Sequence, residues 1–82
     1  MIFDKEFRLE FILHAHNTSA KALKNSLTEF AKDIEVTSLE ADKATDAEDF
    51  KVSLKAEDPT MVFDICAQFG RIRSVRIQEE GD

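Results

Sequence analysis

The chain has 82 residues, of which 17 are acidic and 11 are Lys or Arg, so its formal net charge is −6. This length allows one domain, residues 1–82, and 43% hydrophobic residues predict a globular chain rather than a disordered one. No apolar run is long enough for a membrane span, and the N-terminus lacks the features of a signal peptide. The single cysteine, Cys66, excludes an internal disulfide, so we expect a cytoplasmic protein.

The first half of the chain predicts a strand, a helix and a second strand. Residues 7–14 alternate between apolar and polar side chains, with the odd positions facing a core, as in a half-buried strand. Residues 17–19 are polar and can cap a helix. Over residues 20–34 apolar side chains recur every three or four positions, which predicts an amphipathic helix of about four turns. Residues 36–41 alternate poorly and are expected to form an edge strand.

The second half predicts the same order of elements. Residues 42–49 form an acidic, polar segment that we expect to be a hairpin loop. A clean alternation over residues 50–56 predicts a strand, and the Asp-Pro pair at 58–59 predicts the start of a short helix. Gly70 is expected to end that helix as a left-handed residue, and residues 72–80 are expected to form the last strand.

The order strand-helix-strand-strand-helix-strand predicts an α+β fold, the ferredoxin-like βαββαβ sandwich. Its four-stranded antiparallel sheet is expected to have the strand order 4-1-3-2. Right-handed crossovers place both helices on one face of the sheet. The other face is therefore open, and binding or assembly in this fold can use it.

Alternation assigns side chains to this open face. They are Arg8, Glu10, Ile12 and His14 from the first strand, Lys51, Ser53 and Lys55 from the third, and Ser74, Arg76 and Gln78 from the last. The face can be a solvated surface crossed by cross-strand ion pairs. Alternatively it packs against another sheet or subunit around Ile12, its one apolar residue. In the second interpretation the interface includes Arg8, Glu10, Ile12 and Arg76.

Nucleic-acid binding receives little support from the sequence. Sheets of this topology that bind RNA stack bases on aromatic side chains, whereas every strand phenylalanine here is expected to face the core. The acidic balance also disfavours a phosphate backbone. A nucleic-acid adaptor that uses Arg71, Arg73 and Arg76 is kept as an alternative.

Metal and catalytic chemistry also have weak signatures. His14 and His16 share a strand face and could chelate a metal, but no third ligand is evident from spacing. A small metal-binding protein or enzyme that uses these histidines is a second alternative. The chain has no glycine-rich phosphate loop and no Ser-His-Asp or Cys-His set, so we predict no enzyme and no cofactor.

The second helix and last strand carry a family resemblance. In residues 62–77 the helix ends in Phe69-Gly70, followed by Ile72 and then by Val75 and Ile77 on the last strand. Together with the order of elements over residues 6–78, this stretch resembles a small ACT-like regulatory domain. The resemblance implies pairing side by side or face to face, and binding of small molecules, commonly amino acids, at the subunit junction.

From this resemblance we expect a non-catalytic regulatory, ligand-sensing or interaction module that forms a homodimer or a higher homo-oligomer. A small-molecule effector such as an amino acid would bind at the junction and shift association. The candidate ligand-binding residues are His16, Asn17 and Thr18, because the helix amides behind them favour a carboxylate. Plain helix capping is the other interpretation of this turn.

Overall fold

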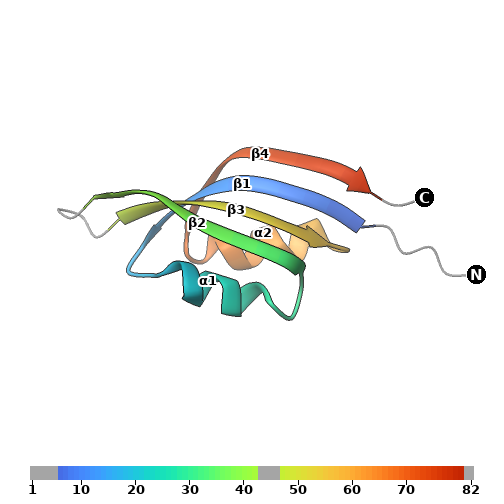
Figure 1. The fold of residues 1–82 in the computed structure, drawn as a ribbon, viewed down its shortest axis with the longest axis horizontal. Coiled ribbons are helices and arrows are strands. Elements are labelled where there is room, and N and C mark those ends of the chain that lie inside the picture. The colour runs from blue at the N-terminus through green and yellow to red at the C-terminus, as the bar shows by residue number, and fades with distance from the viewer. Residues whose placement is uncertain (1–5, 43–46, 81–82) are drawn as a thin grey trace, which may run out of the picture.

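The computed structural model describes residues 6–42 and 47–80 and confirms the predicted order of elements. These elements are β1 (Glu6–His16), α1 (Ala20–Leu27), β2 (Lys32–Asp42), β3 (Ala47–Ala56), α2 (Pro59–Ala67) and β4 (Gly70–Glu80). The four strands form one antiparallel sheet with the order β2-β3-β1-β4. Both helices lie on one side of this sheet and leave the other side open (Figure 1). The chain thus has the ferredoxin-like βαββαβ topology.

The core lies between the sheet and the two helices. Alternate residues of the central strands are buried and confirm the predicted interior positions; they include Leu9, Phe11, Val52 and Leu54. Each helix contributes two buried side chains, Leu23 and Leu27 from α1 and Val62 and Cys66 from α2. The burial of these apolar side chains holds both helices against one face of the sheet.

The first helix is shorter than its apolar spacing predicts. The expected helix over residues 20–34 ends at Leu27, where the Thr28 hydroxyl donates a hydrogen bond to the carbonyl oxygen of Lys24 (2.7 Å). Ile34 continues the helical spacing in the sequence, but it lies on β2 and packs against the core from there. The helical spacing of apolar residues over 20–34 therefore comes from two elements, α1 and β2, rather than from one helix.

The hairpin between β2 and β3 is also more ordered than its composition predicts. The acidic loop predicted over residues 42–49 is wrong at both ends. Asp42 belongs to β2, and Ala47, Glu48 and Asp49 belong to β3 and pair with β1. The remainder of that predicted loop, residues 43–46, lies outside the described residues. Pairing with β1 gives the backbone of these three residues hydrogen-bond partners, which local composition does not reveal.

The start of the second helix follows the prediction, but its end does not. Asp58 caps α2 by accepting a hydrogen bond from the amide of Met61 (3.3 Å), and Pro59 occupies the first turn. Gly70 is not the left-handed residue that we expected, because α2 ends at Ala67, its C-cap residue Gln68 is right-handed, and Gly70 begins β4. Glycine is needed at this position since a Cβ atom would overlap the backbone of His14 and Ala15 on β1.

Candidate functional site

On the open face of the sheet, side chains of neighbouring strands lie in rows. In four rows β3, β1 and β4 all contribute: Lys55–Arg8–Gln78, Ser53–Glu10–Arg76, Lys51–Ile12–Arg73 and Asp49–His14–Arg71. The rows confirm the open-face positions predicted for the first and third strands. They also bring Arg8, Glu10, Ile12 and Arg76, the predicted interface residues, onto one surface.

A β-bulge in β4 changes which of its residues reach this face. Arg73 pairs with Ile12 and Arg76 pairs with Glu10, so β4 has two residues, Ser74 and Val75, where β1 has one. Ser74 has a left-handed backbone (φ 55°), as expected for an inserted residue.

The expectation that the last strand contributes Ser74, Arg76 and Gln78 is therefore incomplete. Arg71 and Arg73, which precede the bulge, also face outward. Strict alternation does not continue through the inserted residue, so odd positions before the bulge and even positions after it share this face. A signal for the bulge was present in the sequence, since the apolar positions Ile72 and Val75 are three residues apart instead of two.

In the four rows across β3, β1 and β4, the charge of the open face is opposite in sign to that of the whole chain. The four rows contain six cationic and two acidic side chains: Arg8, Lys51, Lys55, Arg71, Arg73 and Arg76 against Glu10 and Asp49. The remainder of the sequence contains five Lys or Arg residues against fifteen Asp or Glu residues. A surface of this sign attracts anionic groups although the protein is acidic.

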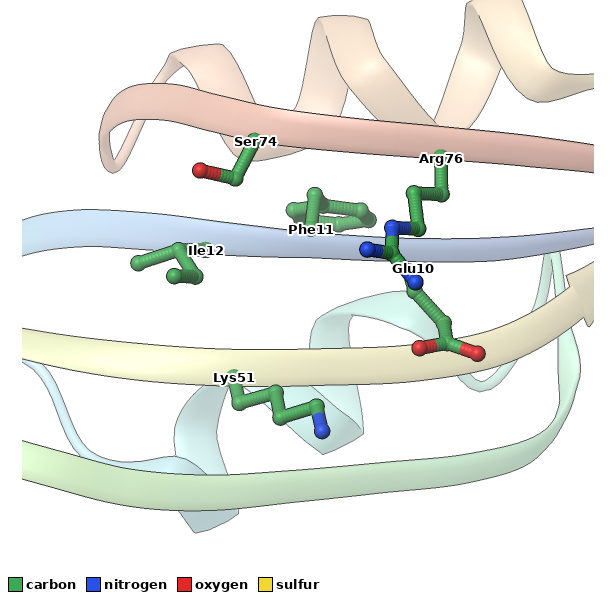
Figure 2. A pocket seen from close by; sticks show the side chains of 6 residues that line it. All are labelled: Glu10, Phe11, Ile12, Lys51, Ser74 and Arg76. Atoms are coloured by element: carbon green, nitrogen blue, oxygen red, sulfur yellow. The ribbon is translucent and has the colours of Figure 1, made fainter.

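A hollow of about 290 Å³ lies on this face beside the bulge. It is lined by Glu10, Phe11, Ile12, Lys51, Ser74 and Arg76. Figure 2 shows Arg76 reaching over β1 from β4, and Glu10 extending toward β3, where Lys51 is anchored. Among the described residues, neither cation forms an ion pair or hydrogen bond with Glu10. The hollow therefore has cationic side chains, Arg76 and Lys51, and an acidic one, Glu10, that can each contact a bound molecule.

Near one end of the face, Asp49 is held by two basic side chains. His14 Nδ1 lies 2.6 Å from Asp49 Oδ1, and Arg73 donates a hydrogen bond to Asp49 Oδ2 at 2.8 Å. The hydrogen bond from His14, together with the charge of Arg73, lowers the pKa of Asp49 below its ordinary value. The three residues come from β1, β3 and β4 and join the strands at this end.

The two histidines considered as metal ligands lie side by side on β1. Their rings meet edge to face with centroids 5.4 Å apart. Nδ1 of His14 already contacts Asp49, and within residues 6–42 and 47–80 no group of three His, Cys, Asp or Glu side chains is arranged to hold a metal ion. Cys66 is buried among core residues, and burial raises the pKa of its thiol to about 11, so it lacks the character of a reactive thiolate.

The turn predicted to bind a ligand begins at His16, the last residue of β1, and continues through Asn17 and Thr18 toward α1. Asn17 has a left-handed backbone (φ 53°), and the helix is capped by Ser19, whose hydroxyl accepts a hydrogen bond from the amide of Ala22 (3.2 Å). These three residues do not line the hollow of the open face. Their role in ligand binding stays a prediction.

Two further observations bear on the class of the protein. No helix in the described part of the chain is long and apolar enough to cross a membrane. Comparison with protein-family models, with curated proteins and with solved structures gives no match. The topology and the open face are therefore the basis for assigning a function.

Proposed function

We propose that the chain is a non-catalytic regulatory module of ACT-like type that binds a small molecule and acts through self-association. The observation that supports this function best is the hollow beside the β4 bulge. There Arg76, Lys51 and Glu10 surround one cavity without pairing with one another.

The chemistry of the hollow favours a small zwitterion such as an amino acid. Arg76 and Lys51 are suited to a carboxylate, Glu10 to an ammonium group, and Ile12 to a short apolar side chain. A volume of about 290 Å³ corresponds to about ten water-sized groups, at roughly 30 Å³ for each. This volume is at the lower limit for small-molecule pockets, which favours a ligand smaller than a nucleotide.

The second part of the proposal is a homodimer formed through β4. This strand is an edge of the sheet, and its apolar side chains Val75 and Ile77 are 44% and 53% exposed. An edge strand presents unpaired backbone groups that a second copy can pair with around a twofold axis. A ligand that contacts Ser74 and Arg76 on the same strand would favour one association state, which links binding to assembly.

The test compares valine with isovalerate, which lacks the amino group, and isobutylamine, which lacks the carboxylate. We expect valine to raise the melting temperature more than either analogue does. Saturation at 100 times the dissociation constant adds about 2.7 kcal/mol of stability. The variant R76A should lose this stabilisation, whereas K21A, which removes an exposed cation from α1, should keep it. No stabilisation by any amino acid, or an equal shift in R76A and the wild type, would contradict the proposed site.

A further inference from the structure

We propose that the cationic part of the open face docks a short acidic segment of a partner protein, lying along β1 between β3 and β4. This inference goes beyond the small-ligand function. It requires neither an occupied hollow nor a homodimer, and it concerns a surface that extends past the hollow at both ends.

Four of the six cations on this face are available to a partner. Arg8, Lys51, Arg71 and Arg76 are exposed and form no ion pair with another residue in the ranges that the structure describes. Since they come from three strands, they form a surface rather than a single line. Unpaired cations of this density repel one another, so an anionic partner would relieve repulsion as well as add contacts.

The dimensions of this surface suit one polypeptide segment. From Arg8 to His14 the rows extend about 20 Å along β1, at about 3.4 Å per residue. From β3 to β4 they are about 10 Å wide, at about 4.8 Å between strands. A single α-helix is about 10–12 Å in diameter, and a strand is narrower. One helix or strand laid along β1 would therefore contact cations on both sides.

The same surface is poorly suited to nucleic acid. Among the described positions that face outward in the four rows, none is Phe, Tyr or Trp, and the one ring, that of His14, already contacts Asp49 and His16. Carboxylates border the surface, with Glu6 at the start of β1 and Glu35 on β2. A long phosphate backbone would extend past the cations onto this acidic border, whereas a short acidic segment fits within it.

The docking surface and the hollow share Arg76 and Lys51. A partner bound across the face would therefore cover the hollow, and a small ligand in the hollow would compete with the partner. Arg71 lies outside the hollow, in the last row beside His14, so it distinguishes the two kinds of binding.

The experiment measures binding of a glutamate-rich peptide to the intact chain by fluorescence anisotropy. A peptide of about 15 residues would span about 22 Å as a helix. Single-stranded RNA of similar length and a lysine-rich peptide serve as comparison probes. We expect the acidic peptide to bind most tightly and its affinity to fall steeply as salt is raised, because exposed charges are screened within about 10 Å at 0.1 M salt.

The variant R71E should weaken binding of the acidic peptide by roughly tenfold, because it replaces attraction with repulsion at the surface. K21E makes the same change of charge on α1, on the other side of the sheet, and should change affinity by less than about twofold. The milder R71Q should give an intermediate loss and controls for any defect in folding.

Three results would overturn the inference: tighter binding of RNA than of the acidic peptide, equal losses in R71E and K21E, or no salt-dependent binding of the acidic peptide. Failure of the small-ligand function is seen separately, since valine binding should be retained in R71E and lost in R76A. If the protein binds the acidic peptide but no amino acid, the docking surface is supported and only the proposal that the hollow binds an amino acid is refuted.

Discussion

Asp49, on β3, is a carboxylate that contacts two basic side chains. It lies in an acidic stretch, yet in the fold it contacts His14 on β1 and Arg73 on β4. Both contacts favour its ionised form, which is why its pKa is lowered. A carboxylate held in this way stabilises the folded chain only while it is ionised.

The pH dependence of stability follows from this shift. Because the pKa of Asp49 is lower in the folded chain than its ordinary value of about 3.9, its contribution is fully present above that value. The contribution is lost as the pH falls through the lower pKa of the folded state. We expect D49N to be less stable than the wild type at neutral pH, and its stability to fall less on acidification, as measured by urea unfolding from about pH 6 to pH 2.

A matched control is D64N, which neutralises an exposed carboxylate on α2 that makes no ion pair with another described residue. It should follow the wild-type pH profile. If D49N and D64N have the same profile, the ionised carboxylate of Asp49 does not stabilise the folded chain.

At the scale of elements, the sequence predicts the strands with one buried face best. β1 and β3 alternate cleanly because one of their faces is in the core and the other is open. The buried residues within 9–13 and 50–56 were predicted correctly, whereas buried Ala15 and Ala47 lie beyond the predicted ends of these strands. The end of α1 was mispredicted because Ile34 on β2 continues the helical spacing. Local pattern therefore identifies elements well but places their boundaries less well when two elements pack against one core.

The candidate site was predictable only in part, for a related reason. Glu10, Ile12, Lys51 and Arg76 were placed on the open face by alternation alone. The hollow itself depends on the bulge at Ser74, which is a property of pairing between β4 and β1 rather than of β4 alone. The three-residue spacing of Ile72 and Val75 indicates an inserted residue in β4, but it does not give the pairing with β1 that forms the hollow.

The close approach of β4 to β1 at Gly70 gives an element-scale prediction. In G70A the new methyl group would overlap the backbone of His14 and Ala15, so the start of β4 must move away from β1. We expect a loss of about 1–3 kcal/mol in the free energy of unfolding, measured by urea denaturation. Q68A, at the exposed end of α2, should change it by less than about 0.5 kcal/mol. Equal stability of G70A and the wild type would contradict the need for glycine here.

At the scale of the whole molecule, the net charge and the charge of the open face predict opposite preferences for anionic partners. The net charge of −6 disfavours anionic partners in bulk, but the fold collects six cations on the face that the helices leave open. The carboxylates are concentrated elsewhere. The sheet therefore has an apolar face that the two helices cover and an open face that carries the cations.

The two edges of the sheet allow the proposed homodimer to be tested with a matched pair of variants. Ile77 on β4 and Leu39 on β2 are 53% and 51% exposed, and each lies on an edge strand. If copies pair through β4, I77K should bring a lysine into the interface and shift the protein toward monomers in sedimentation velocity, while L39K should sediment like the wild type. Dissociation by L39K but not by I77K would assign the interface to β2. A wild-type protein that is monomeric at all micromolar concentrations would refute self-association through either edge, and with it the proposal that a ligand on β4 acts by shifting assembly.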